Sequence, residues 1–254
     1  MTDSPATSWE RLSPRLHGVR EGDRIIPVTE ALGNPPSVYG ERLVATVTGI
    51  RRRWDPYRSK LSAALLRGFR GPLPRTGERW LYLGAATGTT ASHVADLVGP
   101  EGAVYAVEVS VRPFARLLRL AERYPNLLPL LEDARRPEEY APWVPPVDGV
   151  YCDIAQPDQV GIARKNAELF LQEGRPLLLV LKLASLGRGR SPEELVERAL
   201  AELRPFQPIS PPVSLEPYQR LHRLLAVRIG RELPSFTSGR RPRSRRTGPA
   251  VRAR

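Results

Sequence analysis

Charged side chains follow the apolar segments of this 254-residue chain in a regular way. Glu108 follows AVYAV, Asp153 follows GVYC, and Lys182 ends the run PLLLVLK. Helices that cover both faces of a sheet create no structural need for charges at its strand ends, and in such sheets ligands bind beyond the carboxyl ends of the strands. The sequence therefore predicts a site for chemistry where these segments end, and Asp133, which follows LLPLLE, is expected to join it.

A loop of glycine and other small residues joins the first of these segments to a predicted helix. It reads LGAATGTT from Leu83 to Thr90, and small side chains let the backbone approach a ligand at a helix start, where N–H groups are free. The motif is neither the G-x-G-x-x-G of dinucleotide folds nor a P-loop. Glu108 is placed to accept both ribose hydroxyls of a nucleoside, and Asp133 to accept an adenine amino group. The alternatives are a tight turn with a surface Glu108, and an Asp133 that caps the segment RPEEY.

Lysine is rare in this chain, which contains 36 Arg but only three Lys. Arg keeps its proton in proteins, whereas Lys can lose its proton when burial or a nearby cation lowers its pKa. Lys60 and Lys182 are therefore candidates for proton chemistry, while Lys165 lies in a predicted exposed helix. A Lys182 that merely extends into solvent is the alternative. Asp153 ends an apolar segment, where a carboxylate is costly unless it has a partner.

Histidine and cysteine offer few further reactive groups. We expect His17 at the surface and His93 in the packing of the helix after the glycine loop, while spacing alone leaves the role of His222 open. The single Cys152 excludes a disulfide framework and a cysteine-based zinc site, and we expect no metal. No apolar run approaches the ~20 residues of a membrane helix, and no signal peptide is visible. We therefore expect a soluble protein of the reducing cytoplasm that does not contact membranes.

The elements that must position these residues change along the chain. Residues 1–53 contain short alternating segments separated by Gly, Pro and Asn, which are typical of a small β-rich module. Residues 54–230 alternate apolar strands with amphipathic helices, which predicts an α/β domain with a mostly parallel sheet covered on both faces and closed by an antiparallel pair. Residues 231–254 contain Arg, Pro, Ser and Gly without periodicity and are expected to be a disordered tail.

The formal net charge of +12 is unevenly distributed. Residues 1–130 contribute +6, residues 131–230 contribute −1 and the last 24 residues contribute +7. A basic chain suggests a polyanionic partner, although a coding bias towards Arg explains the excess equally well. Because more than half of the excess lies in the tail, the charge alone is weak support for a nucleic-acid site in the α/β domain.

Several segments together resemble one known family. WDPYRSKLSAA at 54–64 is similar to the W-x-P-x-x-S-K-L-x-A-A segment of fibrillarin, and GAATGTT at 84–90, with SHV at 92–94, matches the nucleoside loop of that family. YAVE, DAR and DIAQPDQ, which contain Glu108, Asp133 and Asp153, follow in the family's order, and VYGE at 38–41 is similar to the end of its N-terminal β module. The resemblance covers roughly residues 37–229 and is to the archaeal type.

The resemblance implies a fold and an activity. The fold is the Rossmann-like, seven-stranded α/β fold of S-adenosylmethionine-dependent methyltransferases with a small N-terminal β-rich module, and the reaction is 2′-O-methylation of ribose in rRNA and tRNA. The family's Lys-Asp-Lys-His tetrad maps to Lys60, Asp153, Lys182 and His222; the neighbours of His222 match least, and Lys182 is assigned as the general base. Residues expected to bind S-adenosyl-L-methionine are Gly84, Ala85, Thr89, Thr90, Glu108, Asp133, Ala134, Asp153 and Gln156.

The resemblance also implies partners. Family members act inside a box C/D ribonucleoprotein, in which a guide RNA selects the rRNA or tRNA nucleotide. A Nop-domain scaffold protein holds the enzyme, and a ribosomal-type protein binds the kink-turn of the guide. Two alternatives stay open: a methyltransferase of the same fold that acts on protein or a small molecule, and a non-catalytic assembly subunit.

Overall fold

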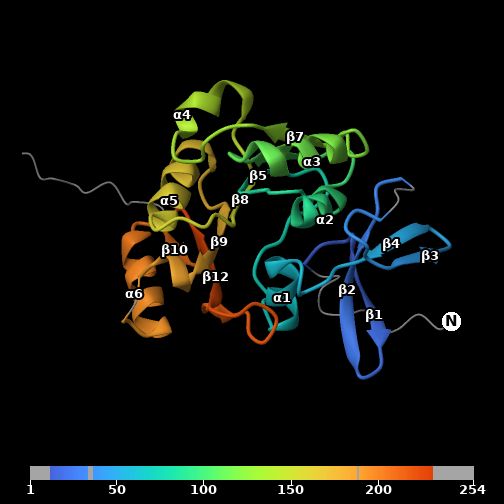
Figure 1. Cartoon of the computed structure of the whole chain (residues 1–254), viewed down its shortest axis with the longest axis horizontal. Helices are drawn as coiled ribbons and strands as arrows, with labels where there is room; N and C mark the ends of the chain where they lie inside the picture. The colour runs from blue at the N-terminus through green and yellow to red at the C-terminus, as the bar shows by residue number, and fades with distance from the viewer. Residues whose placement is uncertain (1–11, 34–36, 188, 231–254) are drawn as a thin grey trace, which may run out of the picture.

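The computed structural model describes residues 12–33, 37–187 and 189–230, and this part of the chain contains two sheets (Figure 1). The smaller sheet is antiparallel, and its order is β1-β2-β4-β3. Its hairpins turn tightly, and Gly22, between β1 and β2, has a positive φ of 61° that favours glycine. The Arg-rich segment that we expect to be disordered lies outside the described residues. The strands are β1 (Leu16–Glu21), β2 (Arg24–Glu30), β3 (Leu43–Thr46) and β4 (Gly49–Arg53).

The larger sheet has the strand order β7-β6-β5-β8-β9-β12-β10, and β11 also pairs with β12. Its parallel strands are β5 (Arg79–Leu83), β6 (Ala103–Val107), β7 (Leu127–Leu130), β8 (Gly149–Cys152) and β9 (Pro176–Lys182). Antiparallel to β9 runs β12 (His222–Arg228), and its two ends pair with β10 (Gln207–Pro208) and β11 (Val213–Ser214). Because β10 and β11 both pair with β12, the eight strands occupy seven positions in the sheet. This arrangement confirms the expected mixed sheet and its antiparallel closure.

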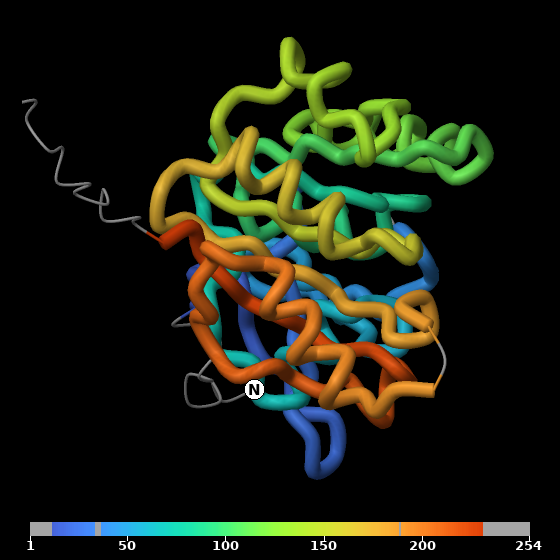
Figure 2. The backbone as a smooth tube through the Cα atoms, turned by 90° about the vertical axis from the view of Figure 1, so that its left-hand side faces the viewer, coloured from blue at the N-terminus to red at the C-terminus, as the bar shows by residue number. Residues whose placement is uncertain are grey.

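Helices cover both faces of the larger sheet, as the alternating pattern predicted. Along β5, Trp80 and Tyr82 belong to one hydrophobic core, while Leu81 and Leu83 belong to the other. The first core includes residues of α1 (Lys60–Leu66), α2 (Thr89–Val98) and α3 (Val111–Ala121). The second includes residues of α4 (Pro137–Tyr140), α5 (Gln159–Phe170) and α6 (Pro192–Glu202). Figure 2 shows the molecule from the side of α5 and α6.

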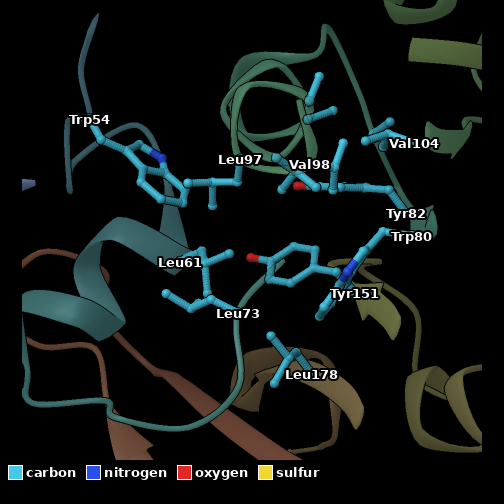
Figure 3. Packing of buried hydrophobic residues seen from close by; sticks show 14 of the residues in the cluster. Trp54, Leu61, Leu73, Trp80, Tyr82, Leu97, Val98, Val104, Tyr151 and Leu178 are labelled. Carbon is cyan, nitrogen blue, oxygen red and sulfur yellow. The ribbon is translucent and has the colours of Figure 1, made fainter. Parts of the chain in front are cut away.

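The smaller sheet packs on the side of α1 and α2. Trp54, which directly follows β4, is fully buried, and its indole ring stacks on the imidazole of His93 with a centroid distance of 4.9 Å. Figure 3 shows Trp54 beside Leu61 of α1 and Leu97 of α2. The chain that leaves the small sheet is therefore part of the core that supports both helices.

A buried polar network completes this junction. The guanidinium of Arg52 in β4 donates to Glu41 Oε1 and to Asp96 Oδ2 of α2, both at 2.8 Å. His93 of α2 lies 2.8 Å from both the Thr29 and the Tyr39 hydroxyls. Burial, helped by Arg52, lowers the pKa of His93 well below its usual value, so this histidine is neutral. The expectation that His93 serves packing is confirmed.

Candidate active site

A cavity of about 370 Å³ lies beyond the carboxyl ends of β5, β6 and β8. From β5 the sheet continues through β6 and β7 on one side and through β8 and β9 on the other, so the strand order reverses at β5. Sheets of this kind bind ligands at such a point. The volume suits a small organic ligand. The lining residues are Gly84, Ala86, Val107, Glu108, Val109, Ser110, Pro113, Glu132, Asp133, Ala134, Arg135, Asp153, Ile154, Ala155, Gln156, Ile162 and Lys182.

The glycine loop forms one wall of this cavity. Gly84 has a φ of 79°, and a Cβ at this position would lie 2.9 Å from the carbonyl oxygen of Asp153. Glycine is therefore required where the end of β5 passes close to the end of β8. Ala86 also has a positive φ, 49°, and its N–H donates to Glu108 Oε2 over 2.8 Å.

Glu108 lines the cavity directly after β6, and only 8 % of its surface is exposed. Its Oε2 accepts the N–H of Ala86 and its Oε1 accepts the N–H of Ser110, each over 2.8 Å. Each carboxylate oxygen has a further lone pair, so the fixed carboxylate can still accept two ribose hydroxyls. The alternative of a surface Glu108 is wrong.

Asp133 lies in the loop between β7 and α4, three residues after the end of β7 at Leu130, so the strand ends earlier than the sequence suggested. The cap of α4 is Arg136, and the alternative of Asp133 as its cap is therefore wrong. Arg135 donates hydrogen bonds to both carboxylate oxygens of Asp133, and these bonds lower the pKa of Asp133. Asp133 is thus a fixed anion on the cavity wall, next to Ala134, which also lines it.

Two lysines meet at one carboxylate on the edge of the cavity. Lys60 Nζ donates to Asp153 Oδ2 over 3.0 Å. Lys182 Nζ lies 2.9 Å from Asp153 Oδ1 and donates to the carbonyl oxygen of Asp153, also over 2.9 Å. Lys60 is the first residue of α1, Asp153 follows β8 and Lys182 ends β9, so three separate elements bring this cluster together. The sequence-based expectation that Asp153 needs a partner is confirmed.

His222 is the first residue of β12 and is the register partner of Lys182. Its Nδ1 lies 2.6 Å from the carbonyl oxygen of Arg220, which can only accept, so Nδ1 carries the proton. Burial and the charges of Lys60 and Lys182 lower the pKa of His222. The neutral ring therefore presents the lone pair of Nε2. The structure thus places all four residues of the expected tetrad at one end of the sheet.

Three residues that we expected to bind the cofactor, Ala85, Thr89 and Thr90, do not line this cavity. Ala85 is buried, and its N–H donates to the carbonyl oxygen of Val107. The Thr90 hydroxyl donates to the hydroxyl of Ser59, the cap of α1. Thr89 lines a second cavity on the other side of the glycine loop.

Sequence reasoning missed the apolar residues of the site. Val109 directly follows Glu108 and Ile154 directly follows Asp153, and both line the cavity with Val107. They form a surface against which a planar base can pack. Val109 and Ile154 directly follow predicted acids in the loops after two neighbouring strands, and this position could have identified them as residues of the site.

Other reactive groups are sparse in the described part of the chain. Cys152 is a free, buried thiol, and burial raises its pKa to about 12. Among the described residues, no His, Cys, Asp and Glu side chains gather in a group of three or more that could hold a metal ion. No helix within the same residues has the length and apolar character needed to cross a membrane.

The cavity fits S-adenosyl-L-methionine, a molecule that combines a nucleoside with a positively charged sulfur. Glu108 and Asp133 offer carboxylates for its hydroxyl and amino groups, and Val107 and Ile154 offer the apolar wall. Gly84 allows the end of β5 to pass close to Asp153, and both residues line the cavity. The strand order with antiparallel β12 and this cavity together define the class: an S-adenosylmethionine-dependent methyltransferase fold.

Comparison with known proteins narrows the class to one family. The fibrillarin family model matches residues 15–231. The chain is 43 % identical over 197 residues to a fibrillarin-like rRNA/tRNA 2′-O-methyltransferase of Staphylothermus marinus, covering 77 % of this chain and 84 % of that relative. The chain belongs to the fibrillarin family.

Solved structures agree with this assignment. Aeropyrum pernix fibrillarin, solved with natively bound S-adenosyl-L-methionine, superposes with a TM-score of 0.77 at 38 % identity and covers 84 % of this chain and 94 % of that one. The fibrillarin of a fibrillarin/Nop5p complex superposes with a TM-score of 0.78 at 40 % identity, covering 86 % and 99 %.

Proposed function

We propose that this chain transfers the methyl group of S-adenosyl-L-methionine to the 2′-hydroxyl of ribose in rRNA and tRNA. The observation that carries the proposal is the contact of Lys60 and Lys182 with Asp153 at the edge of the nucleoside cavity. A ribose hydroxyl is a poor nucleophile, and its methylation needs groups that take up its proton beside the cofactor. The rRNA/tRNA 2′-O-methyltransferase from Staphylothermus marinus supports the same substrate class.

The cofactor supplies a methyl group on a positively charged sulfur. Lys182 acts as the general base and takes the proton of the 2′-hydroxyl while the oxygen forms its bond to the methyl carbon and the carbon–sulfur bond breaks. Asp153 orients Lys182 through its carbonyl oxygen and carboxylate, and Lys60 holds that carboxylate from the other side. Correct orientation of hydroxyl and methyl contributes a large part of the rate.

The proposal also assigns a role to each part of the chain. Residues 54–230 form the methyltransferase domain and residues 1–53 the N-terminal module, with 231–254 as an appended tail. Gln156, which is exposed at the rim, and Ala134 complete the cofactor pocket. Ala85, Thr89 and Thr90 support the loop. The single buried Cys152 fits the reducing cytoplasm.

We further propose that a box C/D guide RNA selects the target nucleotide, with a Nop-domain scaffold and a protein that binds the kink-turn of the guide. The fibrillarin/Nop5p complex supports the scaffold, because its fibrillarin is 40 % identical to this chain. Residues 131–230, which carry a net charge of −1, support delivery of the RNA by partners.

The test is transfer of a tritiated methyl group to a guide-matched RNA, with and without the two partner proteins. We expect transfer in the assembled complex, and we expect Lys182→Arg to abolish it while cofactor affinity stays near that of the unmodified protein. Arg keeps the charge but cannot act as a base. Transfer only to proteins or small molecules, or cofactor binding without any transfer, would overturn the proposal.

A further inference from the structure

The second cavity, of about 430 Å³, lies across the glycine loop from the cofactor cavity. Its walls come from Val38 and Tyr39 of the small module, from Thr87 of the glycine loop and Thr89 at the start of α2, and from α3 with the turn after it. Four arginines complete the lining. We call it the arginine cavity, and its arginines are Arg58, Arg116, Arg119 and Arg123.

Three of these arginines form a row on one side of α3 and its following turn. Arg116, Arg119 and Arg123 are three and four residues apart, which is the spacing of one helix face. The helix contains no acidic residue. Like charges at this spacing destabilise a helix slightly. Arg119 in the last turn is favoured by the helix dipole, but the dipole does not require three arginines on one face.

The four arginines are all exposed and gather around one cavity. None of their side chains forms an ion pair or a hydrogen bond within the described part of the chain, and Arg58 lies over the ring of Tyr39, 5.9 Å from its centroid. In contrast, Arg164 pairs with Glu168 and Arg136 pairs with Glu139. A solvent-exposed face that only needs solubility does not require four unpaired cations around one cavity, whereas an anionic ligand does.

The position of the arginine cavity relative to the proposed active site indicates which anion it binds. Arg58 precedes Lys60 by two residues, on the turn that leads into α1. Thr87 and Thr89 belong to the same loop as Gly84 and Ala86, which line the cofactor cavity. A polyanion bound there therefore runs beside the cluster at Asp153.

We propose that the arginine cavity binds backbone phosphates of the substrate RNA strand next to the methylated nucleotide. This inference rests on the proposed function, because it takes the ribose at Lys60, Asp153 and Lys182 as the reference point. Guanidinium groups bind phosphate oxygens in pairs of parallel hydrogen bonds, and the Thr87 and Thr89 hydroxyls offer further donors. Phosphate contacts fix the register and orientation of a nucleic-acid strand, so these contacts set the direction in which the substrate strand crosses the site.

The test measures RNA binding by the full chain. A fluorescein-labelled single-stranded 12-mer RNA is titrated at several salt concentrations with the unmodified protein, with Arg116→Gln/Arg119→Gln and with a matched control, Arg20→Gln/Arg24→Gln. The control removes the same charge from the exposed β1–β2 hairpin. All three proteins keep residues 231–254, so any contribution of the tail cancels. Glutamine preserves helix propensity at the exposed positions of α3.

We expect the α3 variant to bind RNA about tenfold more weakly than the control and to lower the slope of log affinity against log salt by about 1.4, or about 0.7 for each lost phosphate contact. Equal affinities and slopes for the two variants, or no RNA binding by the unmodified protein at low salt, would overturn the inference. Unchanged RNA binding with loss of a Nop-domain scaffold in a pull-down would also overturn it, and would assign the cavity to that protein.

Methyl transfer by the unmodified protein in the guided complex separates this inference from the proposed function. If the unmodified protein transfers the methyl group but both double variants bind RNA equally, only the proposed RNA contact at the arginine cavity is rejected. Absence of transfer by the unmodified protein rejects the function, whatever the variants bind.

Discussion

Thr90 Oγ1 donates a hydrogen bond to Ser59 Oγ over 3.0 Å, and this contact joins the starts of α2 and α1. Ser59 caps α1 by accepting the N–H of Ser62, and the next residue is Lys60, which bonds to Asp153. The helix that begins at the cofactor loop therefore holds the helix that carries a proposed catalytic lysine. Thr90 is a positioning residue in this arrangement.

Thr90→Val removes the donor and keeps the shape of the side chain. We expect kcat to fall about fivefold, the value of one lost hydrogen bond of ~1 kcal/mol, while the Kd for S-adenosyl-L-methionine stays unchanged. Thr90→Ser, which restores the hydroxyl, should recover most of kcat. The measurement is kcat in the guided complex together with calorimetric cofactor binding. A weakened Kd with normal kcat would show that Thr90 contacts the cofactor instead.

Glu108→Gln should weaken cofactor binding by roughly 10- to 100-fold. The change removes a charged acceptor of ribose hydroxyls, and a hydrogen bond to a charged group contributes about 1.5–3 kcal/mol. The matched control is Glu132→Gln, which removes a carboxylate from the same cavity wall at a position without hydrogen bonds in the described structure. Calorimetric titration with S-adenosyl-L-methionine measures both. If the two variants lose affinity equally, Glu108 has no special role.

The pKa of His222 should lie below its ordinary value, because burial, Lys60 and Lys182 lower it by more than the hydrogen bond to Arg220 and the charge of Asp153 raise it. Lys60→Met should therefore raise this pKa, and Asp153→Asn should lower it further. NMR titration of the ring, assigned with His222→Gln, measures the shifts. Since the folded pKa lies below the unfolded value of ~6.5, protonation favours the unfolded chain, and this group costs stability as the pH falls below ~6.5. Shifts of the opposite sign would place His222 away from the cluster.

Arg52→Met should destabilise the fold by about 3–5 kcal/mol. The substitution leaves the buried carboxylates of Glu41 and Asp96 without their cation, and an unpaired buried charge is costly. The neighbouring Arg53, whose pair with Glu21 is partly exposed, provides the control, and Arg53→Gln should cost less than about 1 kcal/mol. Urea denaturation measures both variants. Equal midpoints would show that the small module is only loosely attached to α2.

The sequence predicted the parts of the fold that depend on local patterns. The capping box at the start of α6, in which Ser191 and Glu194 bond reciprocally, depends on four consecutive residues, and the end of α2 depends on the single residue Gly99. Scarcity of lysine pointed to Lys60 and Lys182 before any geometry was known. Patterns of this kind are readable because each depends on a few neighbouring residues.

Contacts between distant segments were not predictable in the same way. Nothing local indicates that Arg52 bonds to Asp96, 44 residues later, or that Thr90 turns towards Ser59. The burial of Glu108 was also not predictable, because its carboxylate is held by the N–H groups of Ala86 and Ser110 in the folded chain. These features arise only when the sheet brings its loops together.

The antiparallel direction of β12 determines where the chain leaves the domain. The strand begins at His222 beside Lys182 and ends at Arg228 beside Pro176, which is the opposite end of β9. At about 3.4 Å per residue, this strand carries the chain some 20 Å away from the cluster at Asp153. The described part of the chain therefore ends at the side of the sheet remote from the proposed reaction, so a contact between the cluster at Asp153 and β12 is confined to the first residue of that strand, His222.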